Sequence, residues 1–215
     1  MEIIYLGHSA FLFKHRQVRV VTDPVGKAAG FKQIKTEADV VTISHDHFDH
    51  NDLSLIEGEP MIINGPGEYE VKGVYITGIQ SFHDNKQGKE RGRNTLYTFD
   101  IDDLRICHLG DLGDKLTDKN LEILGGVDVL LVPVGGGFTL SPSLAMEVIK
   151  QVGPSIVIPM HFKTTEHNDK FAKLSGVEEF IKISNLEPRR EKKLSLKKID
   201  LAEETELVVL DRYGR

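Results

Sequence analysis

The sequence lacks the features that would place the protein in a membrane or an oxidising compartment. Its 215 residues include one cysteine, Cys107, so an internal disulfide cannot form, which is typical of cytoplasmic proteins. No apolar run reaches the ~18 residues that a membrane-spanning helix needs. Residues 1–7 lack the basic and long apolar segments of a signal peptide. We therefore expect a cytoplasmic protein without a membrane span.

The sequence also lacks an excess of positive charge. It has 27 Lys and Arg against 33 Asp and Glu, a formal net charge of −6. Binding along a phosphate backbone needs concentrated Lys and Arg, so we expect no nucleic-acid partner. The most basic segment, residues 189–193, is short and is interrupted by Glu191. It is interpreted as a solvated face or loop.

The hydrophobic content is 40%, enough for a substantial core, and the length favours one domain over residues 1–215. Short β-favouring runs predict strands in both halves of the chain, and the second half adds segments with helical spacing. Strands are expected at 3–6, 10–13, 18–21, 40–43, 61–63, within 69–79 on both sides of a turn at 72–73, and at 95–100, 104–108, 127–132, 156–159, 193–196 and 206–210. Helices are expected at 50–56, 119–124, 141–152 and 177–183. This pattern predicts two packed sheets with helices outside.

One stretch is unusually rich in metal-ligating side chains. Residues 44–50 read Ser-His-Asp-His-Phe-Asp-His and directly follow the buried strand expected at 40–43. A turn at a strand end can aim several imidazoles and carboxylates at one point. Three further candidates, His83, Asp111 and His161, each lie beyond an apolar run. The sequence therefore predicts a metal site at one edge of a sheet.

The run His45-Asp46-His47-Phe48-Asp49-His50 resembles the HxHxDH signature of the metallo-β-lactamase-fold hydrolases. The resemblance extends through residues 5–8, 22–24, 83, 110–111 and 160–161, and is strongest to the branch of L-ascorbate-6-phosphate lactonase and N-acyl phosphatidylethanolamine phospholipase D. It implies an α/β fold, a four-layer αββα sandwich of two mixed sheets. It also implies a site for two divalent metal ions, formed by His45, His47 and His83 around one ion, Asp49, His50 and His161 around the other, and Asp111 between them. Flavo-diiron proteins of this fold carry glutamate where this chain has His47, so the ligands indicate hydrolysis.

Two such ions would activate a water for attack on carbon or phosphorus. Asp49 could orient that water and take its proton, which makes Asp49 the candidate catalytic residue. Zinc is the expected metal, and Mn²⁺ or Fe²⁺ are alternatives. The leading hypothesis is a hydrolase of a small, possibly anionic ester, lactone or phosphodiester. A metal-binding regulatory or ligand-binding module without turnover is the alternative, and a nuclease is third.

Several positions stay open on the sequence alone. His83 completes the first ligand set unless His108 does, and His8 either lines the pocket or bonds within a turn. Asp23 either supports the ligands from behind, as the resemblance implies, or caps a turn. Cations at Arg91, Arg93 and Lys163 either bind an anionic substrate or are solvated, whereas His15 and His167 are expected at the surface. Specificity would depend on the loops at 26–35, 86–93 and 135–140. The oligomeric state cannot be read from the sequence.

Overall fold

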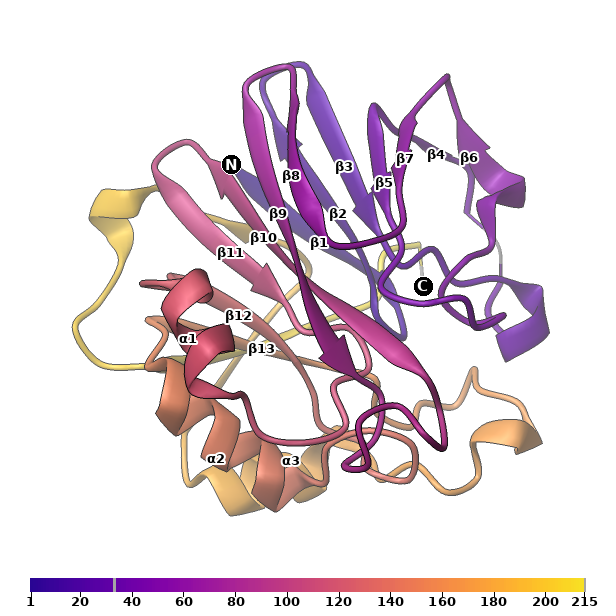
Figure 1. Ribbon diagram of the computed structural model, residues 1–215, viewed down its shortest axis with the longest axis vertical. Helices are drawn as coiled ribbons and strands as arrows, with labels where there is room; N and C mark the ends of the chain where they lie inside the picture. Colours follow the sequence, from indigo (N-terminus) through magenta and orange to yellow (C-terminus); the bar gives the residue numbers. More distant parts are fainter. Residues whose placement is uncertain (33, 215) are drawn as a thin grey trace.

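The computed structural model describes residues 1–32 and 34–214 and places two β-sheets face to face (Figure 1). The first sheet has six strands in the order β15 (Leu194–Ser195), β1 (Glu2–Gly7), β2 (Ala10–His15), β3 (Val18–Thr22), β5 (Val40–Thr42) and β7 (Met61–Ile63). The second has eight strands in the order β14 (Pro188–Glu191), β16 (Glu206–Leu210), β13 (Ile156–Met160), β12 (Val129–Pro133), β11 (Leu104–His108), β10 (Arg93–Ile101), β9 (Val74–Phe82) and β8 (Gly67–Val71). Each sheet contains parallel and antiparallel pairs, so the expected sandwich of two mixed sheets is confirmed.

The alternation of side chains along the first strands explains why this sheet is buried on both faces. In β1, Ile3 and Tyr5 join the large core between the sheets, whereas Ile4 and Leu6 face the other way into a smaller cluster. Successive side chains of a strand point to opposite faces, which requires apolar residues at every position of a doubly buried strand. The outer face is covered by the segments around Val25 and Ile56.

The helices lie on the outer face of the eight-stranded sheet. Figure 1 shows α1 (Asp118–Leu124), α2 (Pro142–Val152) and α3 (Val177–Ser184) gathered beside β11, β12 and β13. Helix α2 begins as its sequence predicts, because the Ser141 side chain caps it and Pro142 occupies its first turn. Its buried face includes Ala145, Val148 and Ile149. No helix among the described residues is long and apolar enough to cross a membrane.

The first sheet has a thinner outer covering. Among the described residues it consists of the 3-10 helices η1 (Lys27–Ala29) and η2 (Leu53–Leu55) and the strand pair β4 (Thr36–Glu37) and β6 (Ile56–Glu57). The helix expected at 50–56 is wrong, because only residues 53–55 are helical, as the 3-10 helix η2. Two further 3-10 helices lie later in the chain: η3 (Asp169–Phe171) follows β13, and η4 (Lys198–Asp200) precedes β16.

The basic segment at 189–193, interpreted as a solvated face or loop, begins as an exposed edge strand, β14. β14 pairs in parallel with β16, and its Arg189 and Arg190 side chains form ion pairs with Glu206 and Glu178. The segment has no β-branched residues and little apolar character, so the strand depends on its neighbour β16 rather than on its own propensity. Its exposed charges agree with the predicted solvated face, and an exposed edge rich in charge resists pairing with other chains.

The strand directions bring the ligand-bearing turns together. Strands β1, β3 and β5 run the same way in the first sheet, and β9, β11 and β13 do so in the second. The carboxyl ends of these strands meet at one end of the sandwich. The backbone N–H of His161, after β13, donates to the carbonyl oxygen of His8, after β1, at 2.8 Å and so ties the two sheets at this end.

Candidate metal centre

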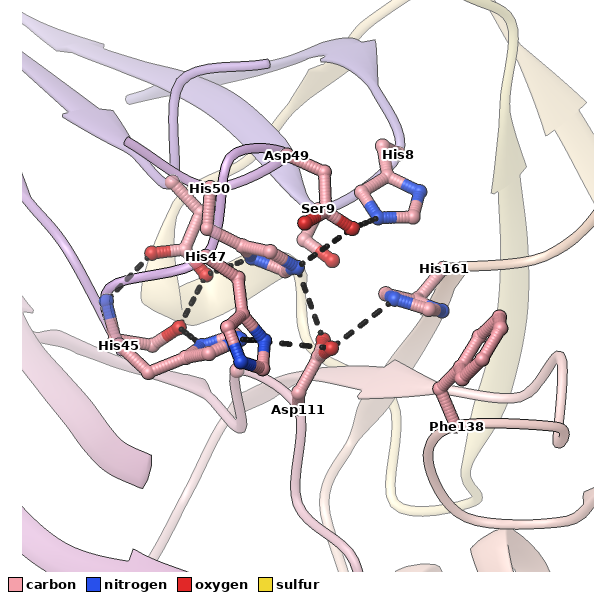
Figure 2. A network of polar contacts seen from close by, with 12 residues as sticks. His8, Ser9, His45, His47, Asp49, His50, Asp111, Phe138 and His161 are labelled. Atoms are coloured by element: carbon pink, nitrogen blue, oxygen red, sulfur yellow. Dashed lines mark hydrogen bonds and ion pairs between the residues drawn. The ribbon is translucent and has the colours of Figure 1, made fainter. Parts of the chain in front are cut away.

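The seven predicted ligands converge at this end of the sandwich (Figure 2). Four come from the turn after β5, and one each comes from the turns after β9, β11 and β13. Their ligand atoms, with those of one further histidine, form three groups within which all atoms lie within 4.8 Å of one another. The groups are His45, His47 and His83; His45, His50 and Asp111; and His8, Asp49, His50 and His161.

Asp111 lies in the middle of the cluster. Its Oδ2 atom is 3.1 Å from Nε2 of His83 and 3.1 Å from Nε2 of His161. Its Oδ1 atom is 3.3 Å from Nε2 of His50, and His45 lies 3.8 Å from Oδ2. One carboxylate thus contacts histidines of both predicted ligand sets, the arrangement that a shared ligand requires.

Close packing at Gly110 fixes the backbone beside Asp111. Gly110 has a φ of +53°, and a Cβ atom there would lie 2.4 Å from Oδ1 of Asn94 and 2.6 Å from Cβ of Ser44. The same Asn94 oxygen accepts the backbone N–H of Asp111 at 2.9 Å. Glycine is required here both for the left-handed conformation and for the close approach. Gly110 therefore allows the turn that carries Asp111 to pack closely against the ligand-rich turn after β5.

Asp23 supports two of the histidines from behind. It is fully buried, and its Oδ2 atom accepts hydrogen bonds from Nδ1 of His50 at 2.8 Å and from Oγ of Ser44 at 2.6 Å. Since the Ser44 hydroxyl proton is used in this bond, its oxygen accepts from Nδ1 of His45 at 2.9 Å. The Nδ1 atoms of both imidazoles are thus used in hydrogen bonds behind the cluster, which leaves Nε2 as the atom that faces the cluster and that can bind a metal once it is free of its proton.

His83 and His108, the two candidates for the third ligand of the first set, lie in different surroundings. His83 is in the cluster, next to Asp111. His108 is buried in β11, with Nε2 2.8 Å from the carbonyl oxygen of Ser9, and its Nδ1 accepts the backbone N–H of Gly110 at 3.1 Å. Both ring nitrogens of His108 are thus used in structural hydrogen bonds.

The loop after His83 is organised rather than loose. Asp84 accepts four backbone N–H groups, from Lys86, Gly88, Glu90 and Arg91, at 2.8–3.0 Å. Desolvation opposes ionisation, but these donors lower the pKa of Asp84 to about 2. At the base of the loop, Gly113 leaves room for the backbone of residues 83–84, which a Cβ atom would approach to 2.4 Å. The loop therefore holds His83 in place.

His8 and His167 belong to the site in a way that the sequence did not reveal. His8 has no exposed surface, and its ring centroid lies 4.0 Å from that of His161. The expectation that His167 is a surface residue is wrong, because it is 7% exposed and its Nε2 lies 2.9 Å from Nδ1 of His8. The polar neighbours of His167 suggested exposure, and its partner is 159 residues away, so no local signal indicated the contact.

Several side-chain atoms of the cluster suit a bound cation. Nε2 of His50 and Oδ1 of Asp111 are buried, lie 3.3 Å apart and form no hydrogen bond of good geometry in the described part of the chain. An unsatisfied buried polar atom costs about 1–3 kcal/mol, so two that face each other call for a ligand. Nitrogen and carboxylate donors of this kind are those that zinc and similar divalent ions use.

The electrostatics of the cluster favour positive charge. Burial lowers the pKa of His50, but the nearby Asp111 and Asp23 outweigh this and raise it well above its ordinary value. Burial raises the pKa of Asp111, yet His161 and His50 hold it well below its ordinary value. Burial, with His50 beside it, lowers the pKa of His45 to about 3, so that ring is neutral. The carboxylates are thus ionised and ready for a cation.

Three phenylalanines border the cluster. The ring of Phe171 lies 5.2 Å from that of His8, 6.1 Å from that of Phe48 and 6.4 Å from that of Phe138. Two of these rings carry a cation: Lys170 lies 4.6 Å from the centre of Phe48, and Arg91 lies 5.2 Å from the centre of Phe138. His47 and Phe48, which is 43% exposed, open this side of the cluster to solvent.

The loops named as specificity elements take part in this border. The Arg91 guanidinium also donates to the carbonyl oxygens of Phe138 and Gly137, which joins the loop after His83 to the glycine-rich loop. In that loop, a Cβ atom on Gly135 would lie 2.2 Å from the carbonyl oxygen of His161, so the loop forms a wall packed on the site. Lys163 donates to the carbonyl oxygen of Asn168 at 3.2 Å.

Comparison with known proteins agrees with this fold and site. A model of the β-lactamase superfamily domain matches residues 2–161. A crystal structure from Thermotoga maritima, described as a candidate Zn-dependent hydrolase of the metallo-β-lactamase superfamily, is 35% identical with a TM-score of 0.81, and the alignment covers 97% of each chain. A metallo-hydrolase from Ignicoccus hospitalis, 22% identical over 86% of this chain and 90% of its own, shares the fold with a TM-score of 0.63. The fold is that of the metallo-β-lactamase superfamily of metal-dependent hydrolases.

Similar sequences place the chain in one family of this superfamily. A UPF0173 metal-dependent hydrolase from Thermococcus onnurineus is 30% identical, and the alignment covers 82% of this chain and 92% of the relative. Another from Desulforamulus reducens is 29% identical and covers 76% and 85%. The chain belongs to the UPF0173 metal-dependent hydrolase family.

Proposed function

We propose that this hydrolase uses two divalent cations, zinc by preference, to cleave a small ester, lactone or phosphodiester. The observation that carries the proposal is the position of Asp111, whose carboxylate lies within 3.1–3.8 Å of His45, His50, His83 and His161. His45, His47 and His83 would hold one ion, Asp49, His50 and His161 the other, and Asp111 both. Manganese or iron would suit the same donors.

When bound, such a metal pair supplies a strongly acidified water and stabilises negative charge that develops on oxygen. The chain's own contribution centres on Asp49. Burial raises the pKa of this carboxyl, but the hydrogen bond from His8 and the nearby His50 lower it below its ordinary value. Asp49 is therefore ionised at neutral pH and can orient a nucleophilic water and accept its proton.

The border of the site supports a substrate with both apolar and anionic parts. Phe48 and Phe138 offer apolar surface, and each has a cation above its ring, Lys170 and Arg91. A carboxylate or phosphate on the substrate would meet these cations while an apolar group rests on the rings. This chemistry is compatible with the lactonase and phospholipase D branch that the sequence resembles, and we infer a small acidic metabolite rather than a polymer.

An alternative is a module that binds metal and ligand without turnover. The presence of all seven ligands and an ionised Asp49 favours catalysis over this alternative. A nuclease is disfavoured by the net charge of −6. We also propose a cytoplasmic location, since Cys107, the lone cysteine, is buried and suited to a reducing environment.

The test is hydrolysis by purified protein reconstituted with zinc or manganese, assayed on generic lactones, carboxylic esters and phosphodiesters. We expect turnover of at least one class and a loss of about 10²–10⁴-fold in Asp49→Ala and more than tenfold in His45→Ala, which lose the proton acceptor and a ligand. Exposed Asp103→Ala is the matched control. Equal turnover by wild type and both site variants would refute the proposal, and tight metabolite binding without turnover would favour the binding module.

A further inference from the structure

Three hydrogen bonds in series connect the loop after β13 with Asp49. The backbone nitrogen of Thr164 lies 3.1 Å from Nδ1 of His167. Nε2 of His167 lies 2.9 Å from Nδ1 of His8, and Nε2 of His8 lies 3.0 Å from Oδ2 of Asp49. The series joins residues far apart in the sequence and ends on the proposed proton acceptor.

The direction of every bond in the series follows from its first member. A backbone N–H can only donate, so Nδ1 of His167 accepts and carries no proton, and the Thr164 hydroxyl, 3.0 Å from the same Nδ1, donates to it as well. The ring of His167 is then neutral, with its proton on Nε2, and donates to Nδ1 of His8. By the same reasoning His8 keeps its proton on Nε2 and donates to Asp49. No other arrangement of protons satisfies all three contacts.

The series is enclosed by aromatic rings. Phe31 and Phe171 lie 4.7 Å and 4.9 Å from the ring of His167, and Phe171 also packs on His8. Asp49 and His167 are each 7% exposed. In so dry a setting hydrogen bonds are strong, and a lost partner leaves a costly unsatisfied group, so the series rigidly defines the position of the carboxylate.

We propose that His167 and His8 are positioning residues that orient the Asp49 carboxylate, and that His8 does not ligate metal. A ring nitrogen of His8 lies within 4.8 Å of the ligand atoms of Asp49, His50 and His161, so by distance alone His8 would be counted as a metal ligand. The protonated Nε2 rules this out, because a ligating nitrogen must offer its lone pair. The inference rests on the proposed function for its catalytic consequence, but not for the hydrogen-bond series itself.

The direct test is to observe the histidine ring nitrogens by ¹⁵N NMR in the full-length protein, first without metal and then with Zn²⁺. His8→Gln and His167→Gln assign the signals. We expect both rings to be neutral with the proton on Nε2, and the Nε2 proton of His8 to remain when zinc is added. A proton on Nδ1 of His8, or loss of its Nε2 proton on addition of zinc, would overturn the inference.

The positioning role is tested by zinc affinity and steady-state kinetics of His167 variants. His167→Phe keeps the volume but removes the donor to His8, and we expect zinc affinity and kcat to fall by about 10–100-fold. His167→Gln retains an amide N–H for His8 and should restore most of the loss. His15→Phe, a half-buried histidine near Asp102, is the matched control.

Thermal melting of the metal-free variants establishes which of them are folded, and only folded variants enter the comparison. Unchanged zinc affinity in a folded His167→Phe protein, or no recovery in His167→Gln, would overturn the positioning role. If wild type shows the expected protons but hydrolyses no substrate, the hydrolase proposal fails separately while the hydrogen-bond series stands.

Discussion

Replacement of Asp23 by asparagine should uncouple the metal ligands from their support. Asp23 accepts three hydrogen bonds, from the backbone and hydroxyl of Ser44 and from Nδ1 of His50, at 2.6–2.8 Å. Asparagine keeps one of the two acceptor oxygens and has an NH₂ group, a hydrogen-bond donor, in place of the other. If its nitrogen takes the place of Oδ1, it meets the Ser44 backbone N–H, a contact between two donors that costs about 1–3 kcal/mol when buried.

If the amide nitrogen instead takes the place of Oδ2, it faces the hydroxyl of Ser44 and Nδ1 of His50, both of which are donors in the wild type. His50 can then satisfy the amide only by moving its proton to Nε2, the atom that points at Asp111. That nitrogen would no longer be free to bind metal. We expect zinc affinity to fall about 10–100-fold, which is about 1.4–2.7 kcal/mol, while the fold is retained.

Competition with a chromophoric chelator measures the zinc dissociation constant of Asp23→Asn. Exposed Asp103→Asn, in the turn between β10 and β11, is the matched control and should bind zinc as the wild type does. Thermal melting of the metal-free protein should show a decrease of roughly 2–10 °C for a loss of 1–3 kcal/mol in a chain of this size. Zinc affinity equal to that of wild type in a folded Asp23→Asn protein would refute the reasoning.

Three further predictions concern stability. The pKa of Asp84 is lowered to about 2, so ionised Asp84 stabilises the folded protein above its ordinary pKa near 4, and this stabilisation is lost as the pH falls through 2. The melting temperature of Asp84→Asn should therefore fall less between pH 4 and pH 2 than that of the wild type. An equal fall in melting temperature would contradict this. Gly110→Ala should destabilise the protein more than Gly153→Ala in denaturant titrations, because both glycines have positive φ but only Gly110 lies against Asn94; equal losses would show that close packing is unimportant. Zinc at 100 times its dissociation constant should stabilise the chelator-treated protein by about 2.7 kcal/mol for each ion bound, and an unchanged melting temperature would argue against a native-state metal site.

The sequence predicted the parts of the site that lie within one turn. The spacing from His45 to His50, directly after an apolar strand, indicated a metal site because that local pattern has few other uses. Strand ends at Asp111 and His161 were also readable, since both residues follow apolar runs at a sheet edge. Their proximity depends on the strand directions of two sheets, and the family resemblance supplied that information.

What the sequence could not reveal were contacts between distant polar residues. His167 follows three polar residues, Thr164, Thr165 and Glu166, and such a context favours the surface. Its burial results from Phe31, in the loop after η1, and Phe171, in η3, which pack against its ring. The choice between His83 and His108 likewise depended on tertiary contact, because only the fold shows that the carbonyl oxygen of Ser9 lies 2.8 Å from Nε2 of His108.

The central claim is that two metal ions in this cluster produce the hydrolytic activity. Its most direct test is to titrate the metal-free protein with zinc while measuring bound metal by elemental analysis and turnover on the best substrate from the panel. We predict that turnover rises to a plateau at two bound ions per chain and is abolished by Asp111→Asn, which would also bind less metal. Full activity without metal, or a plateau at one ion per chain, would contradict the account.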